Sequence, residues 1–233
     1  IIFFYILAKY LKQNHTMKLL PERTVERLSQ YRRVLQREMD NGVEHIYSHD
    51  LAALLHLTPV QVRRDIMLIQ HTGTLRKGYN ISNLIQLIGQ IIDCSGQQKV
   101  AIVGIGKLGL ALLNYMTSNN TKLQLSAVFD NNQDKIGSSY SGVLCHSIDQ
   151  LKKIIKRDNI TIGILTVPAD EAVRLSKIMT DAGILGIINY TPVSLNIEGV
   201  FLEQYDVITS LEKVAYFAKP SNIVLLNERI NKS

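Results

Sequence analysis

The chain has 233 residues, of which 46% are hydrophobic and 20% are charged, and its formal net charge is +6. This composition excludes a disordered chain and allows either one large domain or two modest ones. The positive charge is mild, so it favours a polyanionic partner without requiring one. Because Cys94 and Cys145 are the two cysteines and no Cys/His cluster has metal-ligand spacing, we expect two buried, reduced thiols in a cytoplasmic protein that binds no metal.

The N-terminal segment is apolar but does not have the features of a membrane or secretory signal. Residues 1–8 are apolar, whereas a helix that spans a bilayer needs about 20 such residues. The segment also lacks the basic start and the small-residue cleavage site of a signal peptide. Because the chain starts at Ile1 and Met17 opens a normal domain start, we expect residues 1–16 to be a non-native or upstream extension. The rest of the sequence contains no stretch apolar and long enough to cross a membrane.

Residues 17–94 are predicted to form a first, helical domain. Thr24 is placed to cap a helix that ends at Asn41-Gly42, since threonine is a favoured N-cap and glycine ends helices. The apolar residues of this helix recur at spacings of three and four, which places them on one buried face. They are Val25, Leu28, Tyr31, Val34, Leu35 and Met39.

Two shorter helices follow and form a candidate helix-turn-helix. The first runs from Ser48, as its N-cap, to His56, and the second runs from a Thr58 cap and Pro59 to Ile69. Two short helices with a tight connection are typical of a DNA-binding motif whose second helix enters the major groove.

The second of these helices and the loop after it supply the candidate DNA contacts. Residues 73–79 form a compact basic loop flanked by glycines, which suits a β-wing that touches phosphates or a minor groove. The predicted contacts are Ser48, His49, Gln61, Arg63, Arg64, Arg76, Lys77 and Tyr79. Two alternatives stay open, because the arginines also fit a solvated helix face and Asp65 is placed to pair within the helix. An apolar helix at 81–92 then leads into a linker at 95–96.

Apolar runs alternate with helical patterns from about residue 95 to residue 206. The runs lie at 100–103, 125–129, 143–145, 162–167 and 186–188, and the helices lie near 107–117, 148–156 and 169–182. This alternation predicts an α/β domain with a doubly wound parallel sheet, a Rossmann architecture, with helices on both faces. Ligands of such sheets bind at the carboxyl ends of the strands.

Three glycines after the first run have the G-x-G-x-x-G spacing of a dinucleotide-binding turn. Gly104 permits the tight turn, Gly106 lets the backbone approach a pyrophosphate, and Gly109 allows the helix to pack closely. Asp130 lies 21 residues after Gly109, at the place where an acid hydrogen-bonds the ribose hydroxyls and repels a 2′-phosphate. The sequence therefore predicts NADH and NAD+ as ligands rather than NADPH. The alternative is that these glycines serve only the turn.

The remaining candidate contacts with the dinucleotide follow the ends of the other strands. The predicted set is Gly104, Ile105, Gly106, Lys107, Leu108, Gly109, Asp130, Asn131, Lys135, Thr166, Val167, Pro168, Asn189, Tyr190 and Pro192. A dehydrogenase also needs a proton donor or acceptor beside the nicotinamide, and the strand ends supply no His, Lys or Cys there. His146 is the nearest candidate and is expected in a surface loop. The sequence thus predicts no catalytic residue and favours a sensor over an enzyme.

Residues 207–233 form the C-terminal segment, which follows a complete sheet. Ser210 is predicted to start a helix that reaches Ala218. Its apolar face is expected to be buried through Leu211, Val214, Ala215 and Ala218. Such a helix packs either on another subunit or on its own domain, and residues 222–230 extend it or fray.

Several motifs in this order resemble Rex, the bacterial family of NADH-responsive redox-sensing transcriptional repressors. The matching segments are Val62-Arg-Arg-Asp-Ile66, Gly78-Tyr79, Ile102 to Gly109, Phe129-Asp130, Lys135-Ile-Gly137, Leu165 to Pro168 and Ile188 to Pro192. The resemblance implies a homodimer with an N-terminal winged-helix domain, a Rossmann core and a domain-swapped C-terminal helix. It also implies that NADH releases the dimer from near-palindromic, double-stranded operator DNA, whereas NAD+ favours the bound form. The switching contacts implied by the resemblance are Arg33, Tyr115 and Asp206.

The sequence departs from the family pattern at three places, and two other functions stay open. The family has Phe-Gly after the second helix of the motif and Arg-Gly-x-Gly-Tyr in the wing, where this chain has Ile69-Gln70 and Leu75-Arg-Lys-Gly-Tyr79. The Asn-Phe pair near the nicotinamide is Asn189-Tyr190 here. The alternative functions are an NAD-dependent oxidoreductase with an appended helical domain and a dimeric nucleotide-binding scaffold without a role on DNA.

Overall fold

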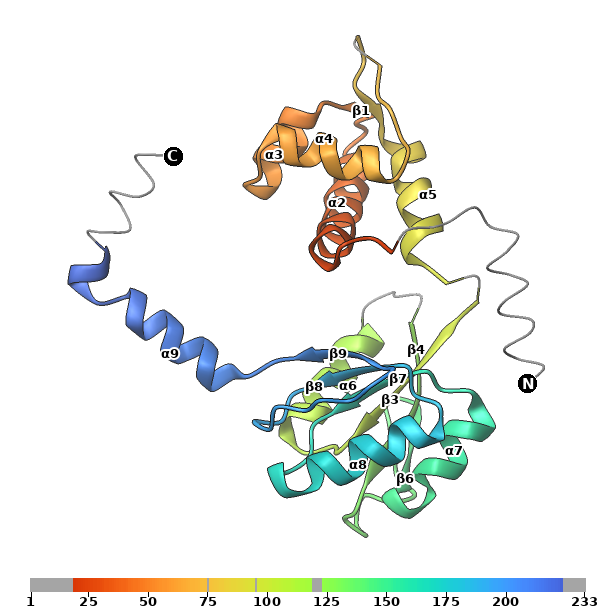
Figure 1. Cartoon of the computed structure of the whole chain (residues 1–233). Coiled ribbons are helices and arrows are strands. Elements are labelled where there is room, and N and C mark those ends of the chain that lie inside the picture. The colour runs from red at the N-terminus through yellow and green to blue at the C-terminus, as the bar shows by residue number, and fades with distance from the viewer. Residues whose placement is uncertain (1–18, 75, 95, 119–122, 224–233) are drawn as a thin grey trace. The chain divides into compact units, whose positions relative to one another are not determined.

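The computed structural model describes residues 19–74, 76–94, 96–118 and 123–223. The chain divides into two compact units between Ser95 and Gly96 (Figure 1). The prediction for residues 1–16 and most of that for residues 222–230 lie outside the described residues. Within the described part of the chain, no helix combines the length and the apolar character needed to span a bilayer.

The first unit contains a helix-turn-helix and a short two-stranded sheet. Its described elements are α2 (Glu22–Asp40), β1 (His45–Ile46), α3 (Ser48–Leu55), α4 (Pro59–Leu68), β2 (Tyr79–Asn80) and α5 (Ile81–Ile92). The strands β1 and β2 pair antiparallel, with Ile46 opposite Tyr79. The helices α3 and α4 follow each other as predicted, and the loop between α4 and β2 lies where the sequence predicts the wing (Figure 1).

The starts of these helices agree only in part with the sequence prediction. The Thr58 cap of α4 is confirmed, because its hydroxyl accepts a hydrogen bond from a backbone N–H in the first turn. Thr24 is not a cap, because α2 begins two residues earlier, after Pro21, and so the Thr24 side chain is buried within the helix. Ser48 is not a cap either, because α3 begins at Ser48 itself with Tyr47 in the cap position.

The core of the first unit lies between α2, α4 and α5. Leu28, Tyr31 and Leu35 follow one another at helical spacing on α2 and are fully buried. The helices α4 and α5 add Val62, Ile66, Ile81, Leu84 and Ile88, and α3 and the two strands add Leu51, Ile46 and Tyr79. The prediction that Val25 and Met39 share this buried face is wrong, because both lie near the ends of α2 and are exposed.

The second unit is built on a seven-stranded sheet in the order β5-β6-β4-β3-β7-β8-β9. Its strands are β3 (Gln98–Val103), β4 (Leu123–Asp130), β5 (Ser139–Tyr140), β6 (Val143–Ser147), β7 (Ile162–Leu165), β8 (Gly186–Asn189) and β9 (Phe201–Gln204). Neighbouring strands run parallel except for β5, which is antiparallel to β6 at one edge. From β3 the chain adds strands on one side and then crosses to β7 on the other, which is the order of a doubly wound sheet. The predicted parallel sheet is confirmed, and the short edge strands β5 and β9 are additions to it.

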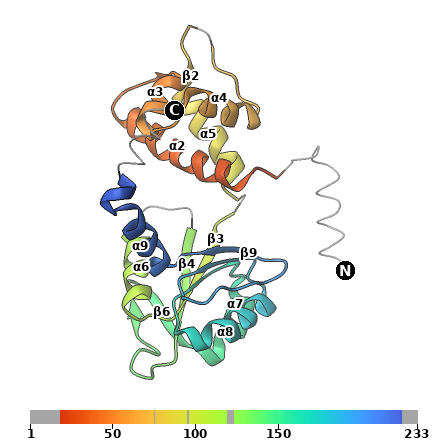
Figure 2. The same ribbon diagram turned by 60° about the vertical axis from the view of Figure 1, so that its left-hand side comes forward.

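Helices cover both faces of this sheet (Figure 2). They are α6 (Lys107–Ser118) on one face and α7 (Leu151–Asp158) with α8 (Ala169–Ala182) on the other, and a 3-10 turn (Ile148–Gln150) precedes α7. Alternate residues of β3 show the arrangement, because Val100 and Ile102 pack with Leu113 of α6, while Ala101 and Val103 pack with α7 and α8. Successive side chains of a strand point to opposite faces. A strand covered on both faces therefore needs the continuous apolar run that the sequence shows.

The last described helix, α9 (Val207–Phe217), begins earlier than predicted and buries none of its side chains within the chain. Asp206 is its cap, since a carboxylate oxygen accepts hydrogen bonds from the backbone N–H groups of Ile208 and Thr209. Ser210 is therefore not the start of the helix. The predicted burial of its apolar face is not found within this chain, because Leu211 and Val214 are 59% and 62% exposed.

The two cysteines differ in their surroundings. Cys145 is buried in β6, as predicted. Cys94 is exposed, so the prediction that it is buried is wrong. The physical reason is its position two residues after the end of α5, where the chain has left the core of the first unit.

Candidate functional site

In the glycine loop between β3 and α6, one of the three glycines has open space beside its Cα, and the other two have none. Gly104 has a φ of +91°, and a Cβ there would lie 2.7 Å from the carbonyl oxygen of Thr166. A Cβ on Gly109 would clash with the carbonyl oxygen of Gly104. By contrast, a Cβ on Gly106 would have no atom within 4 Å. The loop is thus closely packed on the side of the sheet and open at Gly106, where the motif lets a phosphate approach the backbone.

This loop lies at the point where the order of the strands reverses. β3 pairs with β4 on one side and with β7 on the other, and ligands of doubly wound sheets bind at this crevice. The Thr166 hydroxyl, directly after β7, donates a hydrogen bond of 2.5 Å to the carbonyl oxygen of Gly104. Val167 is buried beside it, and Pro168 is exposed before α8. The structure therefore brings Thr166 and Val167 against the glycine loop.

Asp130 lies at the end of β4 with its carboxylate bonded to this same loop. One oxygen accepts hydrogen bonds from the backbone N–H of Ile105 and from the Lys135 ammonium, both at 3.0 Å. The other oxygen accepts a bond of 2.9 Å from the backbone N–H of Asn132. Lys135 also donates to the carbonyl oxygen of Ile105, so a charged pair joins the end of β4 to the start of the phosphate loop.

The carboxylate of Asp130 is ionised at neutral pH. Burial raises the pKa of Asp130, but the bonds from Asn132, Lys135 and Ile105 outweigh burial, so this pKa lies below its usual value. An ionised carboxylate only accepts hydrogen bonds. It is therefore suited to bind hydroxyl groups, whereas a phosphate at the same place would meet its negative charge.

The loop after β8 holds one predicted contact in its interior. The Asn189 side chain, at the end of β8, is buried: it donates to the carbonyl oxygen of Val193 at 2.8 Å and to Gln204 of β9, and it accepts from Thr191. Tyr190 is partly buried, and its ring stacks on Tyr205 with 5.2 Å between the centroids. Pro192 is exposed, whereas Asn189 is fixed in place by these hydrogen bonds.

His146 is part of the sheet and not of a surface loop, so that prediction is wrong. It lies in β6 opposite Phe129 of β4, and its ring packs at 5.8 Å from the Phe129 ring. Burial and the nearby charge of Arg157 lower the pKa of His146. Among the described residues, no group of three or more His, Cys, Asp or Glu side chains is arranged to hold a metal ion.

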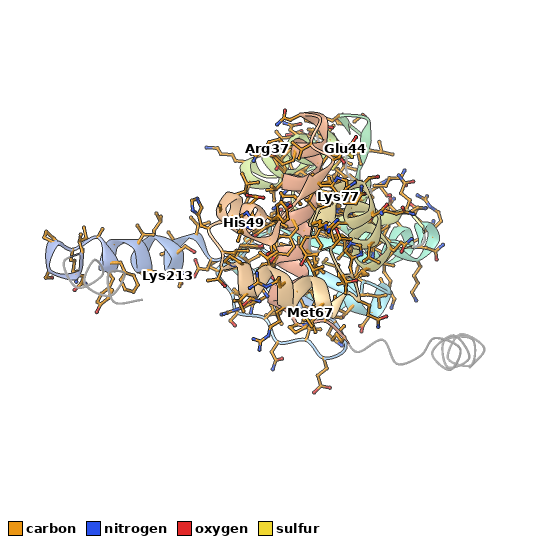
Figure 3. The ribbon with its side chains drawn as sticks, turned by 90° about the horizontal axis from the view of Figure 1, so that it is seen from above. Arg37, Glu44, His49, Met67, Lys77 and Lys213 are labelled. Atoms are coloured by element: carbon orange, nitrogen blue, oxygen red, sulfur yellow. The ribbon has the colours of Figure 1, made fainter. Side chains whose placement is uncertain are left out.

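In the first unit, three of the five predicted DNA contacts on α3 and α4 are exposed, whereas Ser48 and Gln61 are half-buried. Arg63 and Arg64 are exposed on the outer side of α4, and Arg63 donates a hydrogen bond of 3.0 Å to the Ser48 hydroxyl at the start of α3. His49 is exposed beside Ser48, and Figure 3 labels it together with Met67 of α4 and Lys77 of the wing. The Gln61 amide is turned inward and donates a hydrogen bond of 3.1 Å to the buried carboxylate of Asp65.

Asp65 forms a buried network that the sequence analysis missed. Its carboxylate accepts two hydrogen bonds from Arg27, at 2.6 and 2.9 Å, and one from the Tyr31 hydroxyl at 2.7 Å. Burial raises the pKa of Asp65, but the bonds from Arg27 and Tyr31 outweigh burial and hold this pKa below its usual value. Asp65 therefore pairs chiefly with α2 rather than within its own helix. A visible signal was the four-residue spacing of Arg27 and Tyr31, which places both on one face of α2.

The loop between α4 and β2, which we call the wing (residues 73–78), is tied to the start of α3. Thr74 and Gly78 exchange two backbone hydrogen bonds. The Tyr47 hydroxyl donates a bond of 2.7 Å to the carbonyl oxygen of Arg76, and the side chains of Arg76 and Lys77 are exposed. Tyr79, the last predicted contact, is not a surface residue, because its ring belongs to the core and the residue is 8% exposed.

The residues expected to carry the switching contacts lie in different units. Arg33 is exposed on α2 of the first unit, and Tyr115 is exposed on α6 of the second. Asp206, also in the second unit, uses its carboxylate to cap α9. The structure thus assigns each of these residues a place within its own unit.

Comparison with known families gives one match in each unit. Residues 20–66 match the family described as "Putative DNA-binding protein N-terminus", and residues 95–193 match the family described as "CoA binding domain". The redox-sensing transcriptional repressor Rex of Lactobacillus gasseri is 35% identical over 199 residues, which cover 85% of this chain and 93% of the relative. The repressor of the same name from Desulforamulus reducens is 33% identical over 198 residues, 84% of this chain and 94% of the relative.

Solved structures of RSP, a Rex-family repressor, resemble this chain along nearly its whole length. The complex of RSP with β-NAD+ and operator DNA has a TM-score of 0.81, with 28% identity over 93% of this chain and 99% of RSP. The complex of RSP with β-NADH has a TM-score of 0.77 and covers 91% of this chain and 99% of RSP.

Proposed function

This chain belongs to the Rex family of redox-sensing transcriptional repressors, and from that premise we infer that it binds operator DNA as a homodimer and releases it when NADH binds. The observation that carries the inference is the presence in one chain of two different sites. One is the glycine loop with the Asp130 carboxylate in the second unit, and the other is the pair Arg63 and Arg64 exposed on α4 of the first. The oxidoreductase alternative falls away, since the members of this family are repressors.

Residues 95–206, the predicted Rossmann domain, bind NADH and NAD+ in this proposal. The pyrophosphate approaches the backbone at Gly106, where the loop is open, and meets the N-terminus of α6, where N–H groups and the helix dipole favour negative charge. The Asp130 carboxylate accepts hydrogen bonds from the adenine ribose hydroxyls. The crevice between β3 and β7 takes the nicotinamide half, with Tyr190 at its edge. RSP, crystallised with both forms of the dinucleotide, supports this assignment.

The first unit, residues 17–94, binds a near-palindromic operator in double-stranded DNA. Arg63 and Arg64 of α4 enter the major groove, while Ser48, His49, Arg76 and Lys77 position the unit on the phosphates. A two-fold dimer presents two such helices to two half-sites, which makes the operator near-palindromic. The structure of RSP on operator DNA supports this role. It also argues against a nucleotide-binding scaffold without a role on DNA.

The segment 207–233 joins two chains by a swapped helix. Val207, Ile208, Leu211, Val214 and Tyr216 of α9 are each 56–62% exposed, and a helix with this much exposed apolar surface is stabilised by burial on a partner. A second copy of the chain is the partner proposed here, with Asp206 of one chain positioned near Arg33 and Tyr115 for the switch. NADH closes the pair of second units and moves the two α4 helices out of register with the half-sites.

The test is a competition between the two forms of the dinucleotide on selected DNA. Operator sequences are selected from random DNA with the full chain, and binding is followed by fluorescence anisotropy while NADH is titrated against a fixed concentration of NAD+. We expect NADH to release the DNA at micromolar or lower concentration and NADPH to have much less effect. Selection of no sequence, or equal release by NADH and NADPH, would contradict the proposal.

A further inference from the structure

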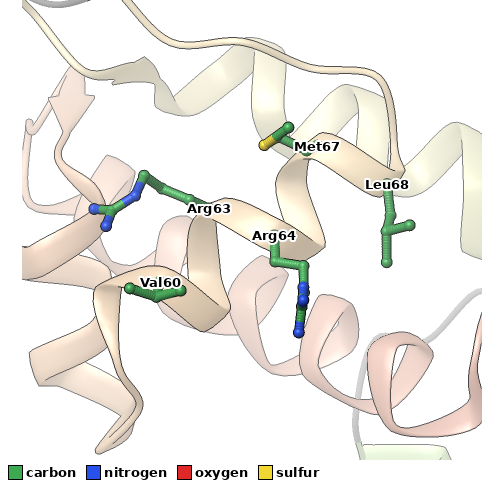
Figure 4. Close-up of a pocket in the computed structure, with 5 residues that line it drawn as sticks. All are labelled: Val60, Arg63, Arg64, Met67 and Leu68. Atoms are coloured by element: carbon green, nitrogen blue, oxygen red, sulfur yellow. The ribbon is translucent and has the colours of Figure 1, made fainter.

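The outer face of α4 carries apolar side chains next to its two arginines. Val60, Met67 and Leu68 are 65%, 69% and 47% exposed. Together with Arg63 and Arg64 they line one shallow, open hollow on the first unit (Figure 4). Figure 4 shows the two arginines extending in different directions from the helix, with Val60 on the turn before them.

These five residues form one continuous stripe along the helix. Positions 60, 63, 64, 67 and 68 follow the spacing of three and four that places residues on one helical face. The core uses the other face, where Val62 and Ile66 are fully buried. Single exposed apolar residues are common on proteins, but an apolar stripe that is also cationic indicates a binding surface.

The charge of the stripe selects the kind of partner. Its two guanidinium groups favour a polyanion, and the acid of this helix, Asp65, is turned inward and bonded to Arg27. DNA is a polyanion that also offers apolar groups, because each thymine presents a C5-methyl in the major groove. A valine side chain has no hydrogen-bonding group. It therefore distinguishes bases only through such a methyl group.

We propose that Val60 is a specificity-determining residue, which contacts the C5-methyl of one thymine in each operator half-site. The inference rests on the proposed binding of DNA by the first unit. Val60 is the second residue of α4, and the N-terminal residues of a recognition helix are those that contact base edges. Its place is well fixed, since Thr58 and Pro59 set the start of the helix and a β-branched side chain has few rotamers.

Met67 supplies a matched control on the same stripe. It is as exposed as Val60, but it lies seven residues further along, or about 10 Å at 1.5 Å per residue. The two side chains therefore do not meet the same base pair. A change at Met67 removes a comparable apolar surface while leaving the contact at Val60 intact.

The experiment replaces single thymines of the selected operator with deoxyuridine, which lacks only the methyl, in both half-sites at once. Affinities of the full chain, Val60→Ala and Met67→Ala are then measured by fluorescence anisotropy at fixed salt. We expect one thymine position at which the unchanged chain loses affinity about four-fold for each methyl, since a buried methylene is worth about 0.8 kcal/mol and 1.4 kcal/mol is a factor of ten. With two half-sites the loss is roughly fifteen-fold.

At that position Val60→Ala is expected to bind the thymine and deoxyuridine operators equally, whereas Met67→Ala keeps the discrimination. The salt dependence of binding stays the same in Val60→Ala, since no phosphate contact is lost. If no position discriminates, or if Val60→Ala discriminates as the unchanged chain does, this inference is wrong and the proposed function stands. A fall in dimer stability without any change on DNA would instead assign the stripe to a protein interface. If no operator can be selected at all, the proposed function itself fails.

Discussion

Each unit of the molecule buries one aspartate against one cation, and the two aspartates differ in what surrounds them. Asp65 in the first unit has a side chain 1% exposed and bonds to the side chains of Arg27, Tyr31 and Gln61. Asp130 in the second unit is 8% exposed and bonds to two backbone N–H groups and to Lys135. The same residue type therefore serves two purposes in one chain.

The surroundings decide which aspartate can take part in binding. The partners of Asp65 come from within the first unit, so its role is to fix α4, the helix that carries Arg63 and Arg64, against α2. Asp130 lies at the carboxyl edge of the sheet, beside a loop that is open at Gly106, and the side chain of Lys135 is 29% exposed. Ribose hydroxyls are therefore able to hydrogen-bond to Asp130 without disrupting a hydrophobic core.

Removal of Arg27 is expected to have the largest effect on this comparison. Arg27→Ala leaves the Asp65 carboxylate buried without its cation, and breaking such a pair costs about 3 kcal/mol or more of unfolding free energy. We expect urea unfolding to show this loss for the first unit, with weaker DNA binding and unchanged NADH binding. Replacing the buried polar group throughout by apolar residues, as in Arg27→Met with Tyr31→Phe and Asp65→Leu, is expected to restore most of the stability.

Arg37→Ala is the matched control for this prediction. Arg37 is on the same helix, but its side chain is 62% exposed and its partner is the neighbouring Glu38. An exposed pair contributes at most about 1 kcal/mol, so the unfolding midpoint should hardly move. Equal losses in Arg27→Ala and Arg37→Ala would show that the Asp65 network does not hold the first unit together.

Arg64→Ala is expected to separate the two units by function. The side chain is exposed on α4, so its loss leaves the fold intact but removes a contact to DNA worth about 1–3 kcal/mol. DNA affinity should fall roughly ten- to hundred-fold in an anisotropy titration, while the affinity for NADH stays the same. Unchanged operator binding by this variant would contradict the assignment of α4 to the major groove.

Asp130→Ala tests the role of the second aspartate in the choice between NADH and NADPH. Without the carboxylate, the repulsion of a 2′-phosphate disappears and Lys135, now released from its 3.0 Å pair, becomes available to a phosphate. We expect NADH affinity to fall about ten-fold, the equivalent of about 1.4 kcal/mol, and NADPH to bind more tightly than before. Titration of the intrinsic fluorescence of each reduced dinucleotide measures both changes.

The double variant Asp130→Ala with Lys135→Ala tests the role given to the lysine. Its affinity for NADPH should return to that of the unchanged chain, while its affinity for NADH should stay as low as in Asp130→Ala. A gain that survives in the double variant would mean that a group other than Lys135 meets the 2′-phosphate.

Periodicity and spacing were enough to predict most of the second unit. The apolar runs, the three glycines and Asp130 are local in sequence, and each has a distinct physical requirement, so the parallel sheet and the glycine loop followed from them. The edge strand β9 did not, because Phe201–Gln204 has no buried apolar run and is recognised only by its pairing with β8. The interior place of Asn189 also depends on a distant partner, Gln204.

Contacts between distant residues explain what was missed in the first unit. Asp65 and Arg27 are 38 positions apart, and Tyr47 meets the wing across 29 positions. The spacing of Arg27 and Tyr31 places both on one face of α2, but it does not identify Asp65 as their partner. Tyr79 follows a basic loop in the sequence, which suggests an exposed position, but its ring packs in the core. The start of α9 was missed for another reason, because Ser210 and Asp206 are both favoured caps and the backbone decides between them.

A change of pH is expected to have the smallest effect, and it tests whether both aspartates stay ionised when folded. The pKa of Asp65 is lowered by folding, so its contribution to stability is complete above the unfolded pKa near 3.9 and is lost as the pH falls through the folded pKa. The difference in unfolding free energy between the unchanged chain and Asp65→Asn should therefore be constant from pH 5 to 8 and shrink below about pH 4, by about 1.4 kcal/mol for each unit of pKa shift. Asp130 has a lowered pKa as well, so its charge should not limit NADH affinity between pH 5 and 8. A stability difference that grows as the pH falls would mean that Asp65 is protonated in the folded chain, and the two aspartates would then differ in charge as well as in surroundings.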